Sequence, residues 1–489
     1  MAGYENYVMK KEELTAGRDQ YELTQYPYLN IGPEDYMANS GTGSEYTSNS
    51  VFGRAIYSYA DRYLFQANIR YDGSSRFASQ YRWGTFPSFS AGWVVSEEKF
   101  MKNANIDWLS FLKLRTSWGM LGNERIGDNY FPYMALMTFN NALFYKDGAV
   151  VSEKTAAQRN LAVEDITWET TTSTDIGVDL GFLNNRLRVT ADYYWKKTKD
   201  MLLSIEIPYS MGYANPKNNA GKMSTTGFDL EISWNDRIND FSYGISANLS
   251  DFKSKIDYLR NSDIISDGKV KRAGVLFNEW YGYVCEGIYQ TQEEIDATPH
   301  LPGTKPGDLI YQDTNGDKSI TWDDAIRIDK STTPKWIFGL TLNGAWKGID
   351  LNVFFQGQAD AEQLVMPAMN MPTDFYEGRW IETNTAEENA SAKWPRAFMK
   401  AAAVDNRNSL SSTWWLRDAS FVRLKSVELG YTFPNLMVKK LGLEKLRIYA
   451  NGNNLFTIDS MGIFDPEMTA GIKGYPIQRT LTFGVNVTF

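Results

Sequence analysis

The chain has 489 residues, which is enough for several ordinary soluble domains or for one large barrel. Its mean hydropathy of -0.41, with no apolar run of the roughly 18 to 20 residues that span a bilayer, excludes a helical membrane protein. One cysteine, Cys285, allows no internal disulfide, and one histidine, His300, argues against zinc clusters and histidine-based catalysis. The net charge of -9 includes no basic block, so no nucleic-acid partner is expected.

The first fifty residues show no clear strand pattern. We expect 1–50 to be a loop region that follows a strand upstream of the chain, with Met1–Tyr4 as the tail of that strand. The opening MAGYENYVMKKEEL has no apolar segment of the kind found in signal peptides. The first recognisable strand begins at Val51.

From residue 51 onward, apolar and polar residues alternate in long runs. The pattern is clear in 63–72, 186–196, 349–356 and 480–489. Many runs reach about 10 to 12 residues, the length of a tilted strand that crosses a bilayer, and many carry Tyr or Trp near an end. The alternative is the aromatic core of a large soluble β-protein, whose strands usually run only about 5 or 6 residues. Strand length therefore favours an antiparallel transmembrane β-barrel.

The connections between these runs are short and long in turn. Short ones fall at Asp61-Arg62, Asn184-Asn185, 236–239 and Lys347-Gly348, and long ones at 122–165, 198–218, 256–333, 358–418 and 458–477. This asymmetry predicts long extracellular loops, short periplasmic turns, and lipid-facing positions such as Leu187, Val189 and Val485. We count about thirteen strands, whereas bacterial single-chain barrels have even numbers. Residues 51–489 are therefore expected to be the C-terminal part of a larger barrel.

Several segments together resemble one known family. They are DRYLFQANIRYDGSSRF (61–77), RWGTFPSFSAGWVVSEEKFM (82–101), ITWETTTSTDIGVDLGFLNNRLRVTADYYWKKTKDML (166–202), NAGKMSTTGFDLEISW (219–234), PKWIFGLTLNGAWKGIDLNVFFQG (334–357), FVRLKSVELGYTFP (421–434), NNLFTI (453–458) and the closing YPIQRTLTFGVNVTF. This set resembles the SusC/RagA family of TonB-dependent transporters of Bacteroidetes-type bacteria.

The resemblance implies a plugged outer-membrane barrel of roughly 22 strands. It also implies import of oligosaccharides or peptides with a SusD-like surface lipoprotein, with energy supplied by the TonB complex. The signal peptide, the plug, the TonB box and the first strands are expected to lie outside this chain. No residue that touches TonB can therefore be assigned here.

No catalytic motif stands out, and adjacent carboxylates such as Asp323-Asp324 would point apart in an extended segment. An outer-membrane enzyme is therefore disfavoured, and no cofactor is required. A glycan-binding or adhesin barrel without active transport stays open as the alternative to a transporter.

One loop has the spacing of a calcium site. Oxygen-bearing residues occupy loop positions 1, 3, 5 and 12, namely Asp313, Asn315, Asp317 and Asp324. A structural calcium ion is therefore predicted there. Lys318 replaces the glycine that is usual at loop position 6, and Asp324 replaces the bidentate glutamate that is usual at position 12. The alternative is a turn held by hydrogen bonds from the backbone to Asp and Asn side chains.

Two aromatic clusters in the long loops are candidate stacking platforms for a ligand. Aromatic faces stack on the apolar faces of sugars, and loops carry function in barrels. The alternative is packing within the loops or against a lid protein. The candidate residues are Trp280, Tyr281, Tyr283, Trp414 and Trp415.

Overall fold

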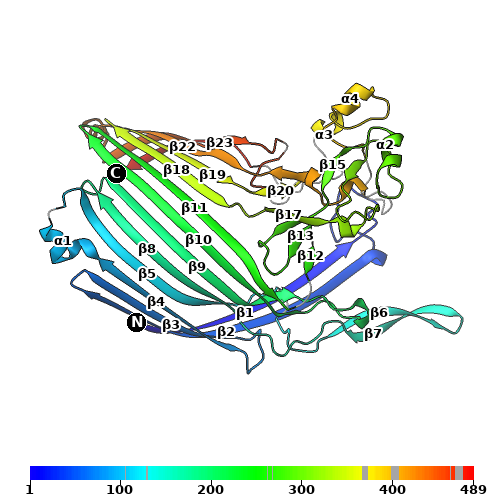
Figure 1. The fold of residues 1–489 in the computed structure, drawn as a ribbon. Helices are drawn as coiled ribbons and strands as arrows, with labels where there is room; N and C mark the ends of the chain where they lie inside the picture. Colours follow the sequence, from blue (N-terminus) through cyan, green and yellow to red (C-terminus); the bar gives the residue numbers. More distant parts are fainter. Residues whose placement is uncertain are drawn as a thin grey trace. The chain divides into compact units, whose positions relative to one another are not determined.

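The computed structural model describes residues 1–489 except 105, 128–129, 261–262, 267, 366–372, 398–406, 463 and 469–476. Its largest element is an antiparallel sheet of fourteen strands, hydrogen-bonded to one another in chain order (Figure 1). These strands are β1 (Ala2–Arg18), β2 (Met37–Tyr59), β3 (Tyr63–Ser74), β4 (Trp83–Val94), β5 (Leu109–Asn123), β8 (Glu169–Phe182), β9 (Leu187–Ser204), β10 (Lys217–Ile238), β11 (Phe241–Leu259), β18 (Trp336–Trp346), β19 (Ile349–Ala359), β22 (Phe421–Thr432), β23 (Lys445–Asp459) and β24 (Thr480–Thr488).

Shorter elements fill the connections. The strands are β6 (Met137–Lys146), β7 (Ala149–Gln158), β12 (Ile264–Ser266), β13 (Lys269–Lys271), β14 (Glu279–Gly282), β15 (Cys285–Ile288), β16 (Leu309–Tyr311), β17 (Ile326–Ser331), β20 (Glu362–Leu364) and β21 (Leu416–Asp418). The α-helices are α1 (Lys99–Asn103), α2 (Gln292–Ala297), α3 (Thr373–Glu377), α4 (Ala386–Ala390) and α5 (Asn435–Val438). The 3-10 turns are η1 (Glu34–Tyr36), η2 (Val95–Glu97), η3 (Tyr209–Met211), η4 (Trp322–Asp324), η5 (Arg407–Ser409), η6 (Thr413–Trp415) and η7 (Lys439–Leu441). Within the described residues, no helix has the length and apolar character needed to cross a membrane.

The expected loop at 1–50 is wrong, because this stretch forms β1 and the first half of β2. The two strands pair without a break from Ala2 opposite Gly53 to Arg18 opposite Met37. Most β1 side chains are exposed on both faces, so no hydrophobic alternation marks this strand in the sequence. The main sheet without β1 contains thirteen strands, and these correspond to the thirteen expected from Val51 onward.

The chain divides into two compact units. The first comprises Met1–Gly92, Thr116–Thr174 and Lys196–Met223. Its hydrophobic core combines aliphatic residues with three aromatic ones, in which the rings of Phe77 and Phe86 lie 5.4 and 5.3 Å from the ring of Trp168. The β6–β7 hairpin belongs to this unit and pairs only with itself in the described sheets.

The second unit comprises Trp93–Arg115, Asp175–Trp195 and Ser224–Phe489. It contains the predicted turn at Lys347-Gly348, which joins β18 to β19. Lys347 and Gly348 have φ values of 46° and 90°, as a two-residue hairpin turn requires. The turn lies at the end of the sheet where Phe241 pairs with Trp346, whereas both long loops leave from the other end. The predicted separation of short turns from long loops is confirmed within this unit.

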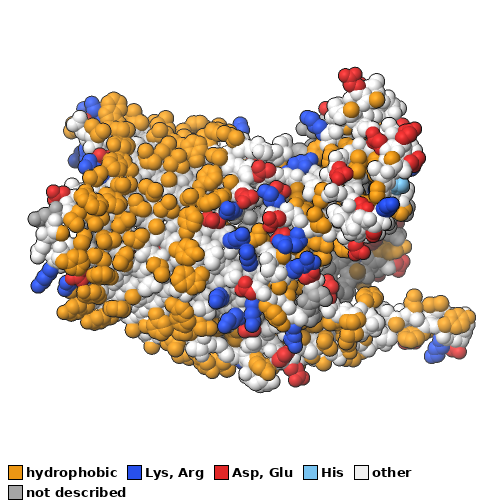
Figure 2. All heavy atoms as spheres, in the orientation of Figure 1, with side chains coloured by type: hydrophobic (Ala, Val, Ile, Leu, Met, Phe, Trp, Pro, Cys, Tyr) orange, Lys and Arg blue, Asp and Glu red, His pale blue; other side chains and the backbone are white. Residues whose placement is uncertain are grey.

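The strands of the second unit have one apolar and one polar face. Ile349 and Leu351 of β19 are exposed, whereas Asp350 between them binds Arg447 of β23 on the opposite face. Val485 of β24 is 61% exposed, and Leu187 and Val189 of β9 are partly exposed. Figure 2 shows hydrophobic side chains gathered over β18, β19 and β22. These strands are therefore not buried in a two-sheet core, and their exposed face suits contact with lipid.

Candidate ligand pocket of the long loops

The described parts of the long connections 260–335 and 360–420 fold together into one body, which we call the loop module. It contains a four-stranded sheet (β12, β13, β14 and β17), two further strand pairs (β15 with β16, β20 with β21), and helices α2 to α4 (Figure 1). A backbone bridge joins Tyr283 of one connection to Ser412 of the other. Its hydrophobic core consists of Tyr283, Ile288, Leu309, Tyr311, Ile320, Phe375, Trp380, Trp394 and Trp415.

Three of the five predicted stacking residues belong to the packed interior. Trp415 is 0% exposed, and Trp280 and Tyr283 are 5% and 4% exposed. The indole N–H groups of Trp415 and Trp280 donate to the backbone oxygens of Asn408 and Glu362, at 2.8 and 2.9 Å. The faces of these rings are covered, so the stacking prediction is wrong for Trp280, Tyr283 and Trp415. Their role is packing, because a long loop body needs an apolar core of its own.

The other two candidates are partly exposed. Tyr281 contacts Trp322, with the ring centroids 5.7 Å apart. Trp414 lines a pocket described below. For these two residues, ligand stacking stays a prediction.

The predicted calcium loop adopts the turn arrangement. The carboxylate of Asp313 accepts hydrogen bonds from the N–H groups of Gly316 and Lys318, at 2.7 and 2.8 Å. Asp317 accepts from the N–H of Ser319, and the side-chain oxygen of Asn315 accepts from the N–H of Asp317. Desolvation acts to raise the pKa of Asp313, but the backbone donors outweigh it, so that this pKa lies below its usual value of 3.8.

Asp324 closes this loop from inside. It is buried and accepts from the N–H groups of Thr314 and Thr321, at 2.9 and 2.8 Å. Ile320 is buried beside it, in the core of the loop module. In the described part of the chain, no three His, Cys, Asp or Glu side chains are grouped so that they could hold a metal ion. The turn alternative therefore accounts for the observed loop, and calcium binding stays a prediction.

A buried carboxylate ties the two connections of the loop module together. Asp308, which is almost fully buried, accepts from Nε of Arg396 at 2.6 Å and from Nδ2 of Asn408 at 2.7 Å. Asn408 in turn accepts from the N–H of Leu309 at 2.9 Å. Removal of a buried charge from water is costly unless it is paired. Asp308, Arg396 and Asn408 therefore form a polar anchor that holds the module in one arrangement.

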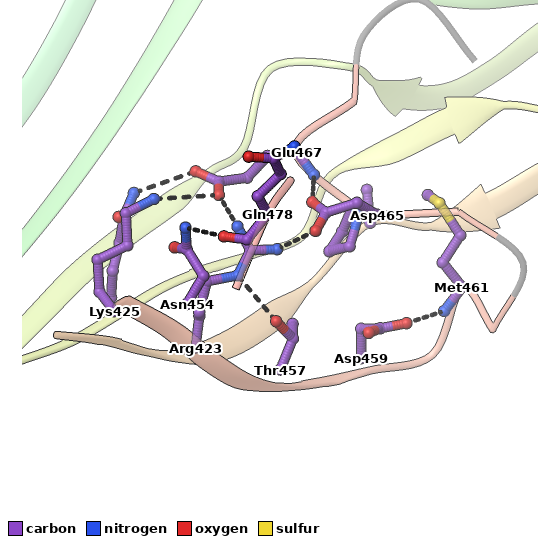
Figure 3. A network of polar contacts seen from close by, with 12 residues as sticks. Arg423, Lys425, Asn454, Thr457, Asp459, Met461, Asp465, Glu467 and Gln478 are labelled. Atoms are coloured by element: carbon purple, nitrogen blue, oxygen red, sulfur yellow. Dashed lines mark hydrogen bonds and ion pairs between the residues drawn. The ribbon is translucent and has the colours of Figure 1, made fainter. Parts of the chain in front are cut away.

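A second buried charge holds the connection between β23 and β24. Arg423 of β22 donates to Thr457 of β23 at 2.8 Å, to Asp465 at 2.5 Å, and to Glu467 (Figure 3). Lys425 also lies 3.5 Å from Glu467. The arrangement fastens the described part of residues 459–468 to β22.

The loop module and the anchored 459–468 segment together line a pocket of about 600 Å³. We call it the loop pocket. Its lining residues belong to β15, η6 and β21, to the segment that follows α4, and to the start of the connection between β23 and β24. The lining residues are Cys285, Lys393, Trp394, Thr413, Trp414, Arg417, Ser460 and Met461.

The chemistry of the loop pocket is cationic and aromatic. Arg417 lies over the ring of Trp394, with its Cζ 5.2 Å from the ring centroid. Desolvation lowers the pKa of Arg417 from its usual value, yet a guanidinium stays charged at neutral pH. Burial raises the pKa of the Cys285 thiol to about 12, so this group is neutral and unreactive.

Sequence reasoning found Trp414 but missed Trp394, Arg417 and Lys393. The run Trp414-Trp415-Leu416-Arg417 places a cation next to the aromatic candidates and could have drawn attention to Arg417. Nothing local connects this run to Trp394 or to Met461. These residues meet only because the buried anchors bring separate loops together.

Comparisons with known proteins agree on one family. Residues 5–455 match the family described as "TonB dependent receptor-like, beta-barrel". The chain is 31% identical to TonB-dependent receptor SusC of Bacteroides thetaiotaomicron over 455 residues, covering 90% of the chain and 43% of that protein. It is 28% identical to TonB-dependent receptor P3 of Formosa agariphila, covering 100% of the chain and 50% of that protein.

A solved structure shows the same fold. The structure titled "Structure of the RagAB peptide transporter" superposes with a TM-score of 0.79 and 25% identity, covering 100% of the chain and 53% of the RagAB chain. The chain thus spans about half the length of the proteins it matches.

Proposed function

The chain belongs to the TonB-dependent receptor β-barrel family, as the barrel portion of a SusC/RagA-type outer-membrane transporter, and from this membership we propose a function for the whole protein. It imports an oligosaccharide or a peptide, works with a SusD-like surface lipoprotein, and takes energy from the TonB complex. The observation that carries the proposal is the match to the RagAB peptide transporter along the entire chain, loops included.

The organisation of the second unit supports this proposal. The long loops form a body with its own core and a pocket, on the side of the sheet opposite the short turns. A transporter needs such a ligand-selecting surface at the outer rim, because specificity in barrels lies in the loops. The family consists of transporters rather than enzymes, which agrees with the absence of catalytic motifs in the sequence.

Growth tests the proposal. The gene for the full-length protein is deleted in the native host, and growth is measured on peptides and on oligosaccharides as sole nutrients. We expect growth to fail on one class of nutrient and to return with the full-length gene. It should not return with the full-length gene in a strain that lacks TonB.

The 489-residue chain by itself is a second arm of this experiment. Carried to the outer membrane behind a signal peptide, it should not restore growth, since energised uptake requires a plug that TonB can move. Restored, TonB-dependent growth would contradict this expectation. If the full-length protein binds nutrient but its deletion changes no uptake, the glycan-binding or adhesin alternative holds instead.

A further inference from the structure

The loop pocket contains positive charge that the described residues do not neutralise. Other arginines in or beside the loop module hold carboxylates; examples are Arg327 with Glu279, Arg396 with Asp308, and Arg423 with Asp465. Arg417 has no carboxylate partner among the described residues, and the same is true of Lys393. Two cations in one partly enclosed pocket repel each other and favour an anion.

The donors of Arg417 are arranged for one kind of anion. Its Nη1 donates to the backbone oxygens of Trp414 and Leu416, at 2.6 and 2.9 Å. These bonds and the contact with Trp394 fix the plane of the guanidinium. Its Nε and Nη2 make no hydrogen bond to the described residues, and together they form the side fork that carboxylates accept with both oxygens.

The aromatic wall adds a rigid surface, because Trp394 stacks on Trp415 at a centroid distance of 5.9 Å. The volume of about 600 Å³ accommodates a sugar ring or an amino-acid residue in addition to its carboxylate.

We propose that the loop pocket binds the carboxylate of the imported ligand, held by the side fork of Arg417, with Lys393 as a second charge and Trp394 and Trp414 as the wall. This inference rests on the proposed import function and narrows its ligand to an acidic one. The carboxylate belongs either to the C-terminus of a peptide or to a uronic acid of an oligosaccharide. Both sources present the same planar pair of oxygens to Arg417.

Binding to the purified full-length transporter tests the inference. The probes are N-acetyl-alanyl-alanyl-alanine with a free C-terminus, the same N-acetylated tripeptide as its C-terminal amide, trigalacturonate, and neutral galactotriose, each measured by calorimetry. We expect one acidic probe to bind at least about tenfold more tightly than its neutral counterpart, in line with the strength of charge-assisted hydrogen bonds. The pair that shows this difference identifies the source of the carboxylate.

Variants then assign the effect to the pocket. Arg417→Gln should weaken the acidic probe about 10- to 100-fold, and Lys393→Gln a few-fold, while neither changes the neutral probe. Lys318→Gln is the matched control, because it removes an exposed charge from the same module outside the pocket. Arg417→Lys keeps the charge but loses the fork, and should fall between the wild type and Arg417→Gln.

The outcomes are separable. Equal binding of the acidic probe to wild type and Arg417→Gln would overturn the inference, as would equal binding of acidic and neutral probes or no binding of either acidic probe. If Arg417→Gln disturbs the loop module, Lys393→Gln and Arg417→Lys carry the test. Uptake of a neutral nutrient with no role for Arg417 would overturn this inference and leave the import function intact.

Discussion

Single buried charges position the long connections of this protein. Asp308 and Arg423 are both buried, and each binds partners far away in the chain. Such groups contribute little net stability when paired, but an unpaired partner left behind is strongly unfavourable. At the residue scale, these anchors therefore act mainly by excluding other loop arrangements.

Arg423→Met tests the anchor of the β23–β24 connection. Asp465 and Glu467 would lose their buried counter-charge, although their side chains keep 19% and 24% exposure. We expect a local loss of about 3 kcal/mol, at the low end for broken buried ion pairs. Hydrogen exchange of 459–468 in the full-length transporter should rise accordingly. The control Lys425→Met removes a more exposed charge and should change exchange little; equal effects of the two variants would contradict the anchor role.

Acidification tests the turn around Asp313. The pKa of this carboxyl is lowered in the fold, so its contribution is present above the ordinary value of 3.8 and is lost as the pH falls through the lower folded value. Exchange protection of the Gly316 and Lys318 amides should therefore decline below pH 3.8. In Asp313→Asn, which has no carboxyl to protonate, the two amides should be less protected at neutral pH and should show no such decline on acidification.

The same protection measured with and without EDTA at neutral pH separates the two accounts of this loop. The hydrogen bonds of the turn predict no change on chelation. Loss of protection with EDTA that is restored by calcium would instead support the calcium hypothesis.

At the scale of elements, the loop module is a folded body with its own core. Its core side chains come from both long connections, and its short strands pair within the module. Backbone hydrogen bonds between residues 274–277 and β11 also join it to the sheet. Because its apolar core is its own, its stability should still be separable from that of the strands.

Trp415→Ala tests this separation. The side chain is fully buried and stacked on Trp394, so its loss should cost the module about 3 to 5 kcal/mol. We expect proteolytic cleavage within 260–335 and 360–420 while the heat-modifiable migration of the barrel persists. Trp322→Ala, at a position 49% exposed that contacts Tyr283 only at the edge of the core, should destabilise the module much less and leave the barrel unchanged. Simultaneous loss of module and barrel would show that they fold as one unit.

At the scale of the whole molecule, the sheet has one apolar face that suits lipid and one polar face. The exposed apolar side chains of β19, β22, β23 and β24 suit lipid, whereas the ion pair of Arg447 with Asp350 lies on the other face. β1 and β24 are the end strands of the main sheet. Unpaired edges promote aggregation, so in the full-length barrel these edges require partner strands.

Val485→Arg tests the lipid-facing assignment in the full-length transporter. A charge on the lipid face costs about 2 to 4 kcal/mol near the bilayer midplane, so the heat-modifiable fraction in outer-membrane preparations should fall. Asn486→Arg, the next position on the same strand, points to the other face and should be tolerated. Equal tolerance of both substitutions would contradict the orientation of β24.

The sequence by itself determined the long strands of the main sheet from Val51 onward, their two faces and the turns, because alternation and turn residues such as Lys347-Gly348 are local signals. It did not reveal β1, whose faces are both exposed and therefore carry no alternation. Only the tertiary structure decided which loop aromatics are packed and which line a pocket. Burial depends on contacts such as that between the N–H of Cys285 and Thr413, which are 128 residues apart. Such contacts form through buried anchors that leave no periodic pattern in the chain.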